Sequence, residues 1–388
     1  RMAWWPGVPL FALITVPWYV VVSLRNPDFL HYHFVVQHFA RFFGGKEYYV
    51  SDEHAQPVRL VVAVVLVGLG GWMLPALPAA LQSLRSALGG IRLLRRVPEV
   101  EDRAGRLSLF CAIWALAVVG FFSLSAAKLI TYVLPAFPAI ALLLGQYVEG
   151  GGLRRWGGRV ALGLMGALSM AAGLAVPSFA ESQDAVPAMV AVTATGPLYI
   201  CLVLAGILLV AAALVKPQAG TLAAGVLTLG LVFSAVCALP AAAPYLQAGY
   251  LVKHLPTPLP QDARVAEWRT YSQSIGFYTG RRMVLVDKSG ELSDRIGKPD
   301  GPAEWFPSGA ESLERLARER SVLLNLNREN WGDWCRTKAS GLYRPIAANS
   351  VYVLLGNDAL IAAMGLRPWP LESVTKPPVL LPARTQAG

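Results

Sequence analysis

Two short segments carry the side chains best suited to chemistry. The first is the aromatic stretch 29–43, in which His38 and Arg41 stand three residues apart. On a helix, this spacing puts both side chains on one face. A guanidinium presents a planar fork of donors that matches phosphate oxygens. His38 and Arg41 are therefore candidate ligands of a phosphate group.

The second segment places a lysine, Lys128, in the apolar run 121–134. A lysine at membrane depth is costly, and such a residue is a functional candidate by default. Tyr132 follows by four residues and shares the helical face of Lys128. We therefore expect Lys128 and Tyr132 to join the first pair as ligands of the same phosphate.

Simpler interpretations exist for both segments. The stretch 29–43 also fits an interfacial helix whose polar side chains lie at the level of the lipid headgroups. Lys128 can instead extend along apolar neighbours to the membrane surface.

A divalent metal is a further alternative, with His38, Glu53 and His54 as its candidate ligands. His31 and His33 are two residues apart and point to different sides of a helix, so they are poor joint ligands. Asp52 and Glu53 are the nearest acids outside the membrane, and we interpret them as surface-loop acids.

Composition identifies the elements that must position these residues. The chain has 388 residues, of which 55% are hydrophobic and only 15% charged, with a mean hydropathy of +0.47. This excludes a soluble enzyme for most of the chain, because soluble domains carry about 25% charged residues. In a soluble protein the net charge of +10 would suggest a nucleic-acid partner. In a membrane protein we first interpret such an excess as marking the cytoplasmic loops, and we expect no nucleic-acid partner. Four widely spaced cysteines indicate neither a disulfide framework nor a cysteine metal site.

The apolar residues form blocks of the length that crosses a bilayer. We predict a polytopic α-helical membrane protein with about seven spans, at 4–24, 60–82, 107–124, 128–148, 160–177, 193–215 and 219–240. Arginines concentrate in the loop 83–106, which is therefore predicted to be cytoplasmic. By alternation, the loop 25–58 and everything after 242 lie on the other side.

The composition changes near residue 243, where charges replace the Gly and Ala runs. We predict a transmembrane domain over 1–242 and a small soluble α/β domain over 243–388. Its strands are expected at 282–286, 321–326 and 350–355, with a helix at 309–320 between the first two.

Several motifs resemble one membrane enzyme family. Pro17-Trp18-Tyr19, Arg25-Asn26-Pro27-Asp28-Phe29 and His38-Phe39-Ala40-Arg41-Phe42 look like the second half of bacterial polyprenyl-phosphate-sugar glycosyltransferases. These are the lipid A aminoarabinose transferases and the related protein mannosyltransferases. The run Phe121–Ser125, followed by Lys128-Leu129, Thr131-Tyr132 and Leu134-Pro135, resembles a second signature of that family.

The resemblance implies a GT-C fold in the bacterial inner membrane, with the C-terminal domain in the periplasm. It implies transfer of a sugar, with inversion, from a polyprenyl-phosphate donor to a lipid A, glycan or protein acceptor. The catalytic residue is unknown, because the family's general base lies in a loop ahead of these motifs. We expect an upstream part of the protein to be missing. Ala126 and Ile130 replace a lysine and a proline common in the family, which leaves the sugar open.

Two other function classes remain open at this stage. A transporter or flippase for lipid-linked sugars also needs cations facing a phosphate, but it often shows internal repeats, which do not stand out here. A non-catalytic assembly protein could use the C-terminal domain to bind a partner. An acidic pair after a first upstream span would favour the transferase.

Overall fold

The computed structural model describes residues 4–27, 29–43, 58–94, 103–125, 128–182, 184–287, 304–374 and 380–385. The chain divides into two compact units. Arg1–Val67 and Ser83–Leu143 make up the first unit, and Gly68–Gln82 and Leu144–Gly388 make up the second.

The first unit is helical and contains the candidate phosphate ligands. It holds α1 (Trp4–Arg25), a π-helix η1 (His31–Ala40) that continues into α2 (Arg41–Phe43), and α5 (Arg103–Leu124). A 3₁₀ segment η5 (Ile130–Ala136) leads into α6 (Phe137–Glu149). The helices α3 (Val58–Gly68), α4 (Ala76–Leu94) and α6 lie at or across the boundaries between the two units.

Within the described part of the chain, six helical segments are long and apolar enough to cross a membrane. They match six of the seven predicted spans in order: Gly7–Arg25, Gly105–Leu124, Thr131–Glu149, Trp156–Glu181, Ala188–Leu214 and Pro217–Leu246. The fold class predicted from the sequence, a polytopic helical membrane protein, is confirmed.

The remaining predicted span, over 60–82, does not form one continuous helix. The chain forms the short helix α3, breaks at a 3₁₀ turn η4 (Gly70–Trp72), and resumes as α4. Gly70 has φ +52°, a conformation that suits glycine. A Cβ on Gly71 would lie 2.5 Å from the Ala224 carbonyl oxygen. The Gly71 amide donates to Thr228 Oγ1 at 3.1 Å. The glycines permit the break and its close packing on α9 (Gly220–Leu246).

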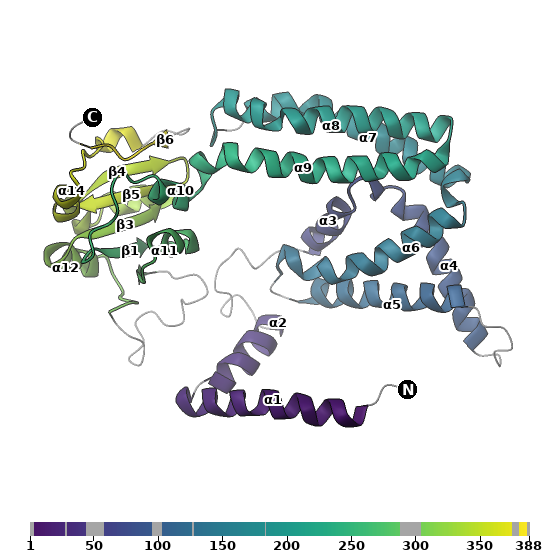
Figure 1. Ribbon diagram of the computed structural model, residues 1–388, viewed down its shortest axis with the longest axis horizontal. Coiled ribbons are helices and arrows are strands. Elements are labelled where there is room, and N and C mark those ends of the chain that lie inside the picture. Colours follow the sequence, from purple (N-terminus) through teal and green to yellow (C-terminus); the bar gives the residue numbers. More distant parts are fainter. Residues whose placement is uncertain are drawn as a thin grey trace. The chain divides into compact units, whose positions relative to one another are not determined.

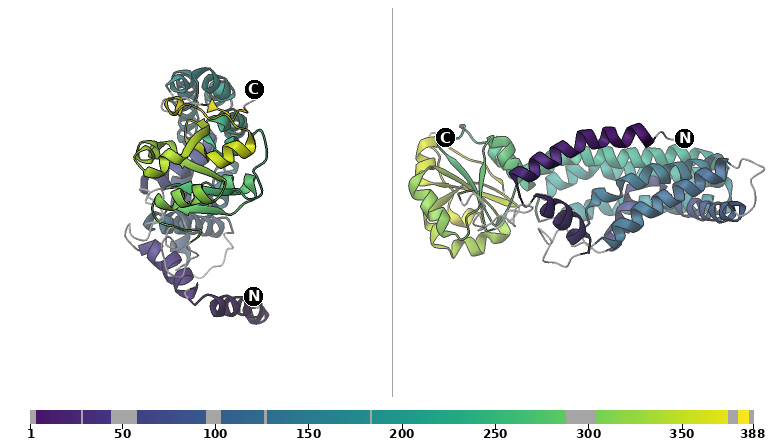
Figure 2. Two further views of the ribbon diagram at one scale, coloured as in Figure 1. Left: turned by 90° about the vertical axis from the view of Figure 1, so that its left-hand side faces the viewer. Right: turned by 90° about the horizontal axis from the view of Figure 1, so that it is seen from below.

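Three long helices form the membrane part of the second unit. α7 (Trp156–Glu181), α8 (Ala188–Leu214) and α9 (Gly220–Leu246) run side by side (Figures 1 and 2). α7 and α8 meet where a Cβ on Gly166 would lie 2.6 Å from the Gly206 carbonyl oxygen. Small residues that allow such backbone approach are typical of helix contacts in membranes.

The C-terminal part of this unit is a six-stranded mixed sheet in the order β2-β1-β3-β5-β4-β6. β1, β2 and β3 are parallel, and β5, β4 and β6 are added antiparallel. The strands are β1 (Arg264–Trp268), β2 (Met283–Val286), β3 (Val322–Asn327), β4 (Tyr343–Asn349), β5 (Tyr352–Asn357) and β6 (Leu380–Leu381).

Helices cover both faces of the sheet and enclose two apolar cores. One core packs α12 (Glu311–Glu319) and α13 (Trp331–Cys335) on one face. The other packs α10 (Ala248–Lys253), α11 (Gln273–Thr279) and α14 (Asp358–Met364) on the opposite face. The predicted α/β domain is therefore present.

Backbone contacts attach the sheet to the end of α9. The Ser350 amide donates to the Tyr245 carbonyl oxygen at 3.0 Å, and Asn349 Nδ2 donates to the Gln247 carbonyl oxygen at 2.9 Å. α9 runs to Leu246, four residues past the predicted end of the membrane domain. The sheet and α7–α9 belong to one compact unit.

A carboxyl group lies in the core of this domain. Glu267 on β1 is fully buried. Its carboxyl oxygens accept from the Ser272 amide at 2.7 Å and from Asn325 Nδ2 at 2.8 Å. Burial raises the pKa of Glu267 to about 8, while these two hydrogen bonds act in the opposite direction. Glu267 is therefore largely protonated in the folded protein at neutral pH.

This burial predicts that the domain loses stability as the pH rises. Below the unfolded-state pKa, near 4.5, Glu267 is neutral in both states; between that value and about 8, only the unfolded state ionises. The unfolding temperature of the whole chain in detergent should fall from pH 5 to pH 9. Glu267→Gln should flatten this dependence, whereas the exposed Glu311→Gln should keep it. An unchanged pH profile in Glu267→Gln would contradict the prediction.

Candidate functional site

Lys128 lies in the turn after α5 and is only 7% exposed. Its ammonium donates to the Ser125 carbonyl oxygen at 2.5 Å. Among the described residues, no carboxylate pairs with it. A cation near a helix C-terminus is favoured by the helix dipole, by about 0.3–1 kcal/mol. An ammonium has three N–H donors, so two are left to bind a ligand.

An aromatic chain links Lys128's neighbourhood to α2. The ring centroid of Phe42 lies 4.6 Å from that of Phe121, Phe121 lies 5.1 Å from Phe122, and Phe122 lies 4.8 Å from Tyr132. Phe42 directly follows Arg41 in the sequence. The ring contacts thus bring the short helix that begins at Arg41 to the end of α5 and to Tyr132.

His38 belongs to a second aromatic group, formed by α1 and η1. His38 Nδ1 donates to the His33 carbonyl oxygen at 2.5 Å, and the two imidazole centroids are 5.1 Å apart. His33 Nε2 lies 3.3 Å from Tyr19 Oη. With Nδ1–H used in this way, His38 can donate to a ligand through Nε2 only as the imidazolium.

The π-helix changes the spacing argument made from the sequence. Its hydrogen bonds run from i to i+5, so residues five apart come together. His38 therefore meets His33, which an α-helical projection places elsewhere. Arg41 begins α2, beyond the π-helix, and its side chain lies outside the described part of the structure. The shared face of His38 and Arg41 stays a prediction.

The predicted alternative of a divalent metal site is not supported by a set of ligands among the described residues. They contain no group of three or more His, Cys, Asp or Glu side chains that could hold an ion. Asp52, Glu53 and His54 fall outside the described residues.

Sequence reasoning missed three residues at the site: Tyr19, His33 and Ser125. Ser125 is buried and supplies the carbonyl that holds Lys128. The signal for Tyr19 was the Pro17-Trp18-Tyr19 motif, whose aromatic rings contact Phe29 at 5.8 Å and 6.1 Å. His33 was considered only as a metal ligand, and its contact with His38 was missed because that contact depends on the π-helical turn.

A hollow of about 550 Å³ lies elsewhere, between α7 and α8. Arg154, Trp156 and Arg159 line its polar end. The residues that line this hollow belong to the second unit, whereas the predicted phosphate ligands belong to the first. We therefore do not include it in the candidate site.

Comparison with known proteins gives relatives for part of the chain. It is 35% identical over 136 residues to the undecaprenyl phosphate-alpha-4-amino-4-deoxy-L-arabinose arabinosyl transferase of Erwinia tasmaniensis, covering 35% of this chain and 21% of that protein. It is 32% identical over 142 residues to a transferase of the same name in Pseudomonas fluorescens, covering 37% and 21%. The matches thus span about a fifth of these relatives' length. No family model matches the chain.

The fold has solved neighbours over nearly the whole chain. The structure of ArnT from Cupriavidus metallidurans bound to undecaprenyl phosphate superposes with a TM-score of 0.69 at 20% identity, covering 92% of this chain and 61% of that one. The apo structure of the same protein gives a TM-score of 0.66.

The chain has the fold of a polytopic helical membrane protein similar to the ArnT structures, with a sheet domain at its C-terminal end. Its particular resemblance is to the bacterial polyprenyl-phosphate-sugar glycosyltransferases, among them the aminoarabinose transferases. The resemblance carried by the sequence motifs is thereby confirmed.

The aromatic chain predicts that α2 and the end of α5 can be cross-linked. In a chain freed of its four cysteines, Phe42→Cys with Phe121→Cys should react efficiently with a short bis-maleimide. Phe42→Cys with Phe110→Cys is the matched control, because eleven residues of helix displace Phe110 by about 16 Å. Mobility on denaturing gels after protease cleavage between the two sites measures the product. Equal yields for the two pairs would refute the contact.

Proposed function

We propose that this protein takes part in moving a sugar from a polyprenyl-phosphate carrier, such as undecaprenyl phosphate, to an acceptor at the periplasmic face of the bacterial inner membrane. The single observation that carries the proposal is the buried Lys128, which pairs with no carboxylate among the described residues and lies within the motifs that resemble the aminoarabinose transferases. The acceptor is a lipid A, another glycan or a protein.

The chemistry explains why cations are needed. The bond between the sugar's anomeric carbon and the phosphate oxygen breaks, and the electron pair stays on the departing polyprenyl phosphate. An acceptor oxygen attacks from the opposite face and inverts the carbon, and its proton passes to a carboxylate base. Preorganised donors stabilise the charge that grows on the phosphate in the transition state.

We assign that role to Lys128 and Arg41. Lys128 reaches the phosphate with the two N–H donors that Ser125 leaves unused. Arg41 adds a bidentate fork from the start of α2. Tyr132 and His38 donate further hydrogen bonds through the phenol and through an imidazolium Nε2. The resemblance places the carboxylate base in a loop ahead of the matched motifs.

The lipid tail of the donor needs an apolar surface beside these groups. Such a surface is supplied at the C-terminal end of α5 by the aromatic chain Phe42, Phe121, Phe122 and Tyr132. Phe121 and Phe42's neighbour Phe43 are more than half exposed, so the rings are open to a polyprenyl chain.

Loss of either cation should slow transfer strongly. In membranes that contain the complete product of the gene, Arg41→Ala or Lys128→Ala should each lower turnover about 100-fold, as for the loss of one preorganised oxyanion donor. Arg41→Lys should recover only part of the rate, because the fork is lost. Transfer of radiolabelled sugar from donor lipid is the measurement.

Lys216→Ala is the matched control, because it removes a cation on the opposite membrane side. It should keep the normal rate, and all variants should insert and fold to the same level. Near-normal rates in both the Arg41 and Lys128 alanine variants would refute the binding of the donor phosphate by these two cations and favour the interfacial-helix interpretation.

The proposed sidedness can be tested directly. In a cysteine-free background, Gln261→Cys in the sheet domain should react with a membrane-impermeant maleimide once the outer membrane is permeabilised. Ser86→Cys, in α4 within the arginine-rich segment 83–106, should react only after the inner membrane is lysed. The reverse pattern would overturn the assignment of residues 243–388 to the periplasm.

A further inference from the structure

An arginine stands at the start of each parallel strand in the sheet domain. Arg264 begins β1, Arg282 immediately precedes β2, and Arg320 lies two residues before β3. Val265 pairs with Met283, and Arg264 pairs with Val322, so the three strands begin in register. Neighbouring strands are about 4.8 Å apart. The topology therefore lines up three arginines at the end of the sheet where the parallel strands begin.

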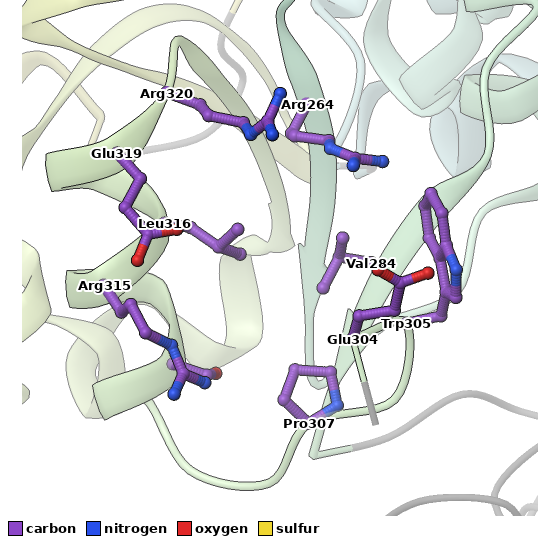
Figure 3. Close-up of a pocket in the computed structure, with 10 residues that line it drawn as sticks. Arg264, Val284, Glu304, Trp305, Pro307, Arg315, Leu316, Glu319 and Arg320 are labelled. Carbon is purple, nitrogen blue, oxygen red and sulfur yellow. The ribbon is translucent and has the colours of Figure 1, made fainter. Parts of the chain in front are cut away.

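Arg264 and Arg320 border a cavity of about 240 Å³, shown in Figure 3, and the Arg282 guanidinium lies over the ring of Trp305, which also lines it. Arg315 of α12 and Arg320, which directly follows α12, form one wall, and Trp305 stands on the other side beside Arg264. The Trp305 carbonyl oxygen accepts from the Leu285 amide at 2.8 Å, which fixes this segment on β2. The cavity lies beside α12, on the sheet face opposite to α10.

Among the described residues, Arg264, Arg282, Arg315 and Arg320 form no ion pair. The Arg264 and Arg282 guanidinium carbons lie 4.9 Å and 5.0 Å from the Trp305 ring centroid. Stacking of this kind orients a guanidinium while leaving its in-plane N–H donors unused.

Two carboxylates, Glu304 and Glu319, also line the cavity. They accept hydrogen bonds and so suit hydroxyl groups, while the arginines suit a phosphate. The cavity is smaller than the roughly 300–1,000 Å³ of pockets for drug-sized ligands, so it fits a small polar molecule.

We propose that this cavity is a binding site for a phosphorylated sugar, either free or as the headgroup of a glycolipid. Arg264 and Arg320 bind the phosphate, and Glu304 or Glu319 accepts from the sugar hydroxyls. The site is separate from the proposed donor site, and it does not depend on it. It gives the sheet domain a recognition role for a phosphorylated glycan.

The test is calorimetric titration of the complete gene product in detergent with glucose 1-phosphate. We expect saturable binding that is at least tenfold tighter than that of methyl glucoside or inorganic phosphate. The double variant Arg264→Met, Arg320→Met should weaken it at least tenfold. Arg318→Met, which removes an exposed α12 arginine outside the cavity, and Lys128→Ala should both leave it unchanged.

Arg315→Gln with Arg320→Gln provides a second variant, because both side chains are exposed and their loss leaves the core intact. It should weaken binding with an unchanged unfolding temperature. Phosphatidylcholine vesicles with or without a phosphorylated glucosamine lipid distinguish the sources: preferred binding to the glycolipid identifies a headgroup, and stronger binding of the free sugar phosphate identifies a soluble ligand.

The proposal is overturned if glucose 1-phosphate shows no saturable binding, or if inorganic phosphate binds as tightly. It is also overturned if Arg318→Met weakens binding as much as the cavity variants. Loss of binding in Lys128→Ala alone would place the ligand at the donor site instead. Since the donor assay uses Arg41 and Lys128, either proposal can fail without the other.

Discussion

The proposed donor site depends on one ammonium group, that of Lys128, which is removed from water at the end of a membrane helix. Lys128 cannot be stable there without polar partners, because unpaired charge in an apolar medium is costly. The Ser125 carbonyl supplies one partner and leaves two N–H donors. The aromatic contacts from Tyr132 to Phe42 then bring the helix that begins at Arg41 to the same place. An anionic headgroup would satisfy both cations at once.

Sequence patterning predicted the membrane part well where the chain is regular. Long apolar blocks predicted six spans because bilayer thickness sets their length. The pattern failed at 60–82, where hydropathy stays high but Gly70 needs a positive φ and Gly71 packs on a neighbouring helix. It also failed at His33 and His38, because a spacing rule for α-helices does not hold in a π-helix.

In the sheet domain, apolar runs predicted β2, β3 and β5 and the helix α12, each within about two residues. Three strands were missed: β1, β4 and the two-residue β6. β1 contains Glu267, an ionisable residue that is unusual in a buried strand and that the fold buries with a raised pKa. β4 contains Arg344 and Pro345, next to a register shift. The alignment of arginines at the end of the sheet where the parallel strands begin could not be predicted, since it follows from strand order.

The most direct test is a double-mutant cycle on the affinity of the complete gene product for undecaprenyl phosphate, measured in nanodiscs. If Arg41 and Lys128 bind one phosphate, each alanine variant should weaken binding at least tenfold. The double variant should then be weaker by clearly less than the product of the two losses. Unchanged affinity in both single variants, or losses that simply multiply, would contradict a shared phosphate.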